Sequence, residues 1–161
     1  MLKEMQQNDF IVSKTDLKGR ITYTNKIFMQ MAEYKEEELL GKPHSIIRHP
    51  DMPKAVFKLL WERVSKKEEI FAYVINKTKN GNDYWVFAYV TASLDEKGNL
   101  IGYYSVRRKP SAKALDIIKP LYAKMLEAEK RSGVEASTKI LTDILTEKGV
   151  SYDELIISIQ E

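Results

Sequence analysis

The sequence contains no cysteine, and its two histidines, His44 and His49, lie in one short segment. The lack of cysteine excludes disulfides, thiolate nucleophiles and zinc sites built on thiolates. The sequence also shows no glycine-rich fingerprint for a nicotinamide nucleotide, no activated nucleophile and no cluster of metal ligands. We therefore expect a protein that is not an enzyme.

Long apolar segments and charge of one sign are missing as well. No stretch approaches the length of a membrane span, and the N-terminal segment 1–8 lacks the apolar core of a signal peptide. The 26 basic and 23 acidic residues, net charge +3, are interspersed and form no basic stripe interleaved with aromatic residues. These absences predict a cytoplasmic protein that neither inserts into a membrane nor binds nucleic acid.

The chain has enough apolar residues to form a hydrophobic core. Hydrophobic residues make up 43% of its 161 residues and charged residues 30%, which is typical of one soluble domain with an appendage. Strand-like runs, rich in β-branched and aromatic residues, stand on both sides of a helical middle. These runs are 10–15, 20–24, 70–77, 84–91 and 100–107.

The order of the elements predicts the fold class. Two strands, several short helices and a three-stranded meander indicate an α+β fold, in which helices close one face of a five-stranded antiparallel sheet. Pro110 begins a different region of three amphipathic helical stretches, and we expect the first of them, 112–130, to be kinked or restarted at Pro120. We therefore divide the chain into 1–109, a core with a short N-terminal lead-in, and 110–161, a C-terminal helical extension.

The segment Gly41–Pro53 holds the most distinctive chemistry of the chain. It contains three prolines and both histidines, and the prolines predict an extended backbone up to a helix that begins near Lys54. Asp51 is the expected N-cap of that helix. Because free N–H groups at a helix start attract anions, Arg48 and His49 just ahead of it indicate a seat for an anionic group. The alternative is a rigid loop whose polar groups satisfy one another.

Four segments of the sequence resemble the sensor domain of the aerotaxis receptor Aer, which is a PAS domain. They are Ser13–Asn25, Gly41–Pro53, Asn76–Val86 and Gly102–Arg107. The resemblance covers roughly residues 9 to 126, and the run Arg-His-Pro-Asp-Met-Pro at 48–53 is absent from PAS domains at large. It implies a PAS fold with a C-terminal helical tail, which binds FAD non-covalently and reports redox or energy state to the chemotaxis machinery.

The resemblance also implies which residues bind the cofactor. Arg48, His49 and Asp51 match positions that the family uses to retain FAD. The other candidates match positions that line or wall the pocket, and they are Asn25, Asn76, Phe57 and Trp61. The residue types suit the ligand, because amides can bond the pyrimidine edge of the isoalloxazine ring, aromatic side chains can cover its faces and cations can bind its pyrophosphate.

Each candidate also has an alternative role. Asn25 is placed to cap a helix, and Trp61 and Trp85 can be plain core residues. His49 could ligate a haem iron, but haem-binding PAS domains place that histidine on the long helix, which here contains none. Asn76 stands in the middle of a strand, with no cap or turn to serve, which favours a binding role.

The chain departs from the family pattern on two strands. Aer-type domains carry Trp-Ser/Thr-Gly where this chain has Ile70–Ala72, and their arginine and asparagine on the next strand become Phe87 and Tyr89. We expect Phe71 or Tyr73 to supply the ring contact of the missing tryptophan. The alternative function is a PAS adaptor without flavin, which binds a small metabolite or mediates protein–protein association only.

Aer continues into a membrane anchor and a signalling coiled coil, and neither follows in this sequence. The chain is therefore more similar to CetB, the separate soluble PAS subunit of two-protein energy-taxis systems. This likeness implies a membrane-bound chemoreceptor as signalling partner and membrane association only through that partner. The helical tail past Pro110 is then the coupling element, or the interface of a homodimer.

Overall fold

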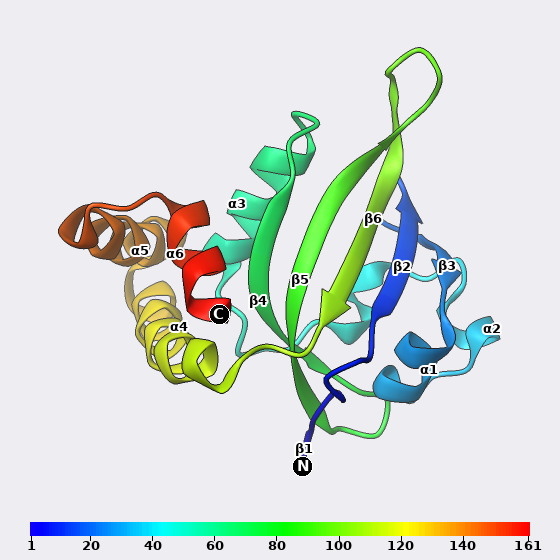
Figure 1. The fold of residues 1–161 in the computed structure, drawn as a ribbon, viewed down its shortest axis with the longest axis horizontal. Helices are drawn as coiled ribbons and strands as arrows, with labels where there is room; N and C mark the ends of the chain where they lie inside the picture. Colours follow the sequence, from blue (N-terminus) through cyan, green and yellow to red (C-terminus); the bar gives the residue numbers. More distant parts are fainter.

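In a computed structural model that describes residues 1–161, the chain forms one curled sheet with helices around it (Figure 1). The strands are β1 (Leu2–Lys3), β2 (Ile11–Asp16), β3 (Ile21–Thr24), β4 (Ile70–Lys77), β5 (Asp83–Leu94) and β6 (Leu100–Arg108). The helices are α1 (Lys26–Ala32), α2 (Glu36–Leu39), the 3-10 turn η1 (His44–Ile47), α3 (Lys54–Val64), α4 (Ala112–Ser132), α5 (Val134–Lys148) and α6 (Tyr152–Gln160). None of the helices has the combination of length and apolar character that crossing a bilayer requires.

The five predicted strands form one antiparallel sheet in the order β3-β2-β6-β5-β4. This confirms the α+β fold. The expected purely antiparallel sheet needs one correction, because the two residues of β1 pair in parallel with the start of β5. The backbone N–H of Asp83 donates to the carbonyl of Met1, which anchors this short strand. A strand of two residues has no periodicity that a sequence pattern could reveal.

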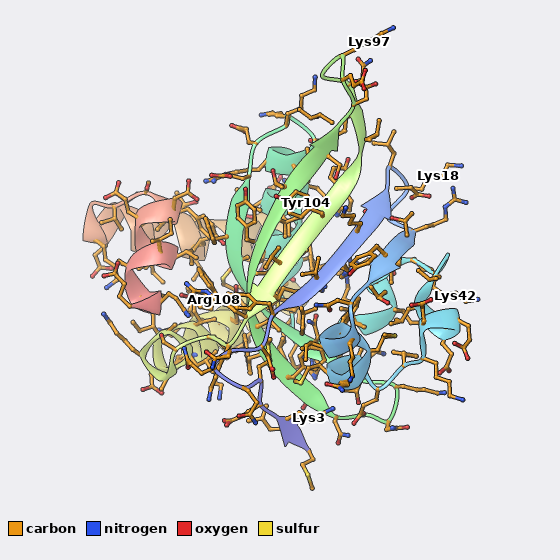
Figure 2. The ribbon with its side chains drawn as sticks, turned by 45° about the vertical axis from the view of Figure 1, so that its right-hand side comes forward. Lys3, Lys18, Lys42, Lys97, Tyr104 and Arg108 are labelled. Carbon is orange, nitrogen blue, oxygen red and sulfur yellow. The ribbon has the colours of Figure 1, made fainter.

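Side chains alternate between two faces of the sheet. The elements α1, η1 and α3 all lie on one of these faces, which we call the inner face. On this inner face β4 and β5 present Val74, Asn76 and Ala88, all buried. The opposite, outer face carries Tyr104 and Arg108 of β6, which lie on the side of the sheet turned toward the viewer in Figure 2. The inner face lies beneath α1, η1 and α3, whereas at β4 and β5 the C-terminal tail packs on the outer face.

The segment ahead of α3 is folded more tightly than expected. Instead of staying extended, it forms the 3-10 turn η1, and Arg48 then makes an antiparallel bridge to Asn76 on β4. The expected N-cap is also corrected. Pro53 occupies that position, and the side chain of Asp51 caps nothing.

The C-terminal tail wraps around the β4 edge of the sheet, on the opposite side of the molecule from α1 and α2 (Figure 1). Helix α4 runs through Pro120 without a restart. Proline removes one helical hydrogen bond there, and the burial of Ile118, Leu121 and Met125 on one face of α4 outweighs that loss. These residues join the sheet in one hydrophobic cluster, so core and tail share a single core.

Two tyrosine hydroxyls of the tail bond to the free edge of β4. Tyr152 donates to the carbonyl of Phe71 at 2.7 Å, and Tyr122 donates to the carbonyl of Tyr73 at 2.6 Å. In return the hydroxyl of Tyr73 donates to the carbonyl of Ile156 on α6 at 2.8 Å. An open strand edge is a template for aggregation, and here the tail covers it.

The tail also holds both ends of α3. At its start, the carboxylate of Glu129 on α4 accepts from the backbone N–H of Lys54 at 2.9 Å and of Ala55 at 3.1 Å. At its end, Arg63 forms an ion pair with Asp153 of α6 at 2.7 Å. The helix start predicted to seat an external anion is thus occupied by a carboxylate of the same chain.

Replacing Glu129 with alanine should lower the free energy of unfolding by about 1–2 kcal/mol, because two N–H groups at the start of α3 lose their acceptor. Urea unfolding followed by circular dichroism measures the change. Glu127→Ala is the matched control, since its exposed pair with Arg131 on the same helix contributes little. Equal stability of the two variants would show that Glu129 does not act as a cap.

Candidate functional site

A cavity of about 310 Å³ lies between the inner face of the sheet, the η1 loop and α3. Its volume is at the lower end of the range for pockets that enclose a small molecule. Most of the wall is apolar, and the polar groups are concentrated at the deep end and at the mouth. The residues on which the following description depends are Ser13, His44, Arg48, Phe57, Trp61, Val64, Val74, Asn76, Ala88, Tyr103 and Arg107.

Arg107 of β6 is the deepest charged group of the cavity, with 3% of its surface exposed. Its Nη2 donates to Ser13 Oγ at 2.6 Å, and its Nη1 lies 3.3 Å from His44 Nε2. The guanidinium also lies over the ring of Phe28, 4.6 Å from the ring centroid. These partners are all neutral, and no carboxylate lies within ion-pair distance of Arg107.

His44 must be a neutral acceptor in this arrangement. Its Nε2 faces Arg107, which can only donate, and it lies 3.0 Å from Ser13 Oγ. Burial and the nearby charge of Arg107 lower the pKa of His44 to about 3. Ser13 therefore accepts from Arg107 and donates to His44, so Arg107 is held by a chain of neutral groups.

Several buried donors around Arg107 have no hydrogen-bond partner. They include Nε of Arg107, Nδ2 of Asn76 and the hydroxyl of Tyr84. Arg107 and Asn76 both line the cavity. Burial raises the pKa of Tyr84 to about 12, so this hydroxyl stays protonated and can donate. Buried polar groups are rarely left without partners, so these donors could bond to acceptors of a molecule that enters the cavity.

The mouth of the cavity combines a cation with aromatic surface. Arg48 is exposed there and lies over the ring of Phe57, 4.2 Å from the centroid. Trp61, 42% exposed, contacts the ring of Tyr103 edge-on, with centroids 5.1 Å apart. A flat ring could enter between these residues, and an anionic extension of it would meet Arg48.

The structure brings four of the seven sequence-predicted residues to the cavity and places three outside it. The four that line it are Arg48, Phe57, Trp61 and Asn76. Asn25 caps α1, with its Oδ1 accepting from the N–H of Phe28 at 3.1 Å and its Nδ2 donating to the carbonyl of Phe10 at 2.8 Å. Oδ1 also accepts from the N–H of Val12 at 3.0 Å, so this oxygen has no lone pair left for a ligand.

His49 and Asp51 lie outside the cavity and bond to their own surroundings. Nε2 of His49 bonds to the carboxylate of Asp83 at 2.9 Å, and its Nδ1 accepts from the N–H of Asp51 at 2.9 Å. The side chain of Asp51 is 67% exposed. This geometry fits a rigid loop that aims Arg48 at the cavity, and direct contact of either residue with a ligand stays a prediction.

The PAS fold family matches residues 21–107, which is more than half of the chain. The chain belongs to the PAS family. The aerotaxis receptor of Escherichia coli is 40% identical over 122 residues, which are 76% of this chain and 24% of the receptor. Phototropin-2 of Oryza sativa is 25% identical over 78% of this chain and 14% of its own length. The chain thus spans a quarter or less of both relatives.

Solved structures agree with this assignment. A light-oxygen-voltage domain, studied with a flavin analogue, superimposes with a TM-score of 0.59 at 25% identity, covering 71% of this chain and 85% of that one. A PAS domain from Colwellia psychrerythraea superimposes with a TM-score of 0.57 at 19% identity, over 62% of this chain and 85% of its own. The predicted PAS fold and the resemblance to the aerotaxis receptor are confirmed.

The expected replacement of the family tryptophan is wrong. Phe71 and Tyr73 point to the outer face of the PAS sheet, where their rings pack against Phe87 at 5.4 and 4.9 Å, so neither can contact a ligand in the cavity. Tyr89 is on the same outer face. The changes from the family pattern at Phe87 and Tyr89 therefore do not alter the cavity.

Sequence reasoning missed the deepest polar group of the PAS pocket. Arg107 lies in a segment that we had singled out, and it alternates with Ser105 and Tyr103 on one face of β6. Because side chains alternate along a strand, this spacing places Arg107 on the buried face of β6. A charged side chain is rare on a buried face, so the spacing indicates a functional residue. Ser13 and His44 could be paired with it only through the fold.

The PAS domain should lose stability between pH 6.5 and about 3 because of His44. Its pKa in the folded state, about 3, is below its usual 6.5, so only the unfolded chain takes up the proton in this range. The loss reaches up to about 3 kcal/mol between pH 7 and pH 4. Urea unfolding at a series of pH values measures it. His44→Gln should flatten the upper part of the profile, and a profile unchanged from that of the parent would contradict the assignment.

Proposed function

We propose that this PAS domain is a cytoplasmic sensor that binds FAD non-covalently and signals redox or energy state to a chemotaxis receptor. The observation that carries the proposal is a cavity with unused buried donors at its deep end and a cation at its mouth. The 40% identity to an aerotaxis receptor and the likeness to a light-oxygen-voltage domain studied with a flavin analogue support it.

The residues present fit a flavin dinucleotide. A cavity of about 310 Å³ suits the ring system alone, so the rest of the dinucleotide would lie at the mouth. There Arg48 is placed to bind a phosphate. The apolar walls formed by Val64, Val74 and Ala88 exclude water from the ring. Asn76, with free N–H groups, can donate to the pyrimidine edge.

The bound flavin supplies a group whose charge changes on reduction. The chain responds through α3, which forms one wall of the cavity with Phe57 and Trp61 and is tied to the tail at both ends. A shift of α3 therefore reaches the tail directly. We propose that the signal passes to a membrane-bound receptor chain and that no catalytic turnover is involved.

The second candidate function is a PAS module that binds a small carboxylate metabolite without flavin. The unpaired cation Arg107 favours it, because a carboxylate is the partner that a buried guanidinium most often takes. Such a module would transmit occupancy of the cavity rather than redox state.

The visible absorption spectrum of the purified protein, before and after addition of FAD and then dithionite, tests the leading proposal. The expected spectrum is that of a bound oxidised flavin that bleaches on reduction. Failure to bind FAD added in excess would overturn the proposal and leave the carboxylate-binding module.

A further inference from the structure

Arg107 is a buried cation for which the chain supplies no counter-charge. Its surface is 3% exposed, its bonded partners are Ser13 and His44, and its Nε has no partner. The charge of Arg48 adds to the positive potential, as its contribution to lowering the pKa of His44 shows. The titratable groups that face Arg107, His44 of η1 and Tyr84 of β5, are both neutral near pH 7.

A charge in this position is unfavourable for the fold by itself. Taking an ion out of water costs several kcal/mol unless an opposite charge or a full set of hydrogen bonds compensates. Burial lowers the pKa of Arg107 to about 10, which reflects this cost and still leaves it charged at neutral pH. A methionine would fill the same space without the penalty. A negative charge that enters the cavity would offset this cost.

The position of Arg107 determines which part of the ligand meets it. Arg48 at the exposed mouth is available for phosphate, whereas Arg107 lies at the enclosed end with the free donors of Asn76. A pyrimidine edge of the flavin placed at the enclosed end would lie beside Arg107. Uptake of two electrons from a reductant such as dithionite, and of one proton from water, would leave N5 protonated and one negative charge shared by N1 and the carbonyl oxygen on C2.

We infer that Arg107 discriminates between the oxidation states of the bound flavin by pairing with the negative charge that reduction creates on the pyrimidine edge. This inference rests on the proposed function. The oxidised ring is neutral and offers Arg107 only hydrogen bonds, whereas the reduced ring offers an ion pair in a dry site. A group that binds the reduced flavin more tightly than the oxidised flavin raises the reduction potential of the flavin. The rise is equivalent to the difference between the two binding free energies.

The experiment compares the holoprotein with Arg107→Met, Arg107→Lys and the control Arg108→Met. Arg108 is the next residue on β6 and carries the same charge on the opposite, outer face, where Figure 2 shows it. Three quantities are measured for each protein: the affinity for oxidised FAD, the midpoint potential of the bound flavin, and the melting temperature of the FAD-free protein.

For Arg107→Met we expect the preference for the reduced form to fall at least tenfold, which lowers the midpoint potential by about 30 mV for a two-electron couple. Affinity for oxidised FAD should fall less than affinity for the reduced form, because the oxidised ring loses only hydrogen bonds to Arg107. The FAD-free variant should melt at the same or a higher temperature, because it no longer buries an unpaired charge. Arg107→Lys should recover most of the potential, and Arg108→Met should match the parent.

The outcomes separate this inference from the proposed function. If the parent binds FAD and Arg107→Met leaves the potential unchanged, the inference fails and the proposed function stands. A lower melting temperature of FAD-free Arg107→Met, with no recovery of the potential in Arg107→Lys, would show that Arg107 is structural and also overturns it. A parent that binds no FAD overturns both.

Discussion

Ala88→Phe should abolish FAD binding and leave the protein folded. Ala88 lies on the inner face of β5, is 3% exposed and forms part of the cavity wall. A phenyl ring at this position points into the space that the isoalloxazine would occupy. Overpacking usually costs about 1–3 kcal/mol, and here the empty volume of the cavity can accept the ring, so the cost should be at the low end.

FAD titration, followed by quenching of flavin fluorescence, measures the loss, with at least a hundredfold weaker binding expected. Ala92→Phe is the matched control, since Ala92 lies on the same strand and the same face but beyond the residues that line the cavity. Circular dichroism and the melting temperature establish that both variants are folded. Retention of full affinity by a folded Ala88→Phe protein would place the flavin elsewhere.

Deletion of the tail, residues 110–161, should leave a core that is no longer a stable monomer. The deletion exposes apolar surface that Ile118, Leu121 and Met125 now cover, among other tail residues of the shared hydrophobic cluster. Each large apolar side chain contributes about 1.5–3 kcal/mol when fully buried, so the sum approaches the 5–15 kcal/mol of net stability typical of a whole domain. The free β4 edge would also lose both tyrosine hydroxyls, which favours aggregation.

Size-exclusion chromatography with light scattering, together with urea unfolding, measures the effect. The double variant Tyr122→Phe, Tyr152→Phe is the control that removes only the two hydroxyl bonds to β4, and it should lose about 2–4 kcal/mol and remain monomeric. A monomeric 1–109 fragment that unfolds cooperatively with the stability of the full chain would show that the tail is an independent unit.

The sequence was informative wherever a local pattern decides the structure. Runs rich in β-branched and aromatic residues located β2 to β6, and the Ser-x-x-Glu pattern of Ser151 and Glu154 forms a capping box at the start of α6. Asn25 caps α1 as its position indicates. These features depend on neighbours within a few residues, which a sequence displays directly.

Contacts between distant residues were not predictable in this way. The cap of α3 is Glu129, 75 residues from Lys54 along the chain, so the nearby Asp51 was the natural but wrong choice. Arg107 is joined to Ser13 across 94 residues. The family resemblance drew attention to the Arg-His-Pro-Asp run, of which the structure brings only Arg48 to the cavity, while the partners of Arg107 come from β2 and η1.

The attachment of α3 at both ends has a mechanical consequence. An 11-residue helix is a stiff rod about 16 Å long, and it is fastened to α4 at one end and to α6 at the other. Such a rod cannot tilt about one fastening without stretching the other, so the two attachments together resist tilting. A displacement of α3 as a whole should therefore move α4 and α6 together.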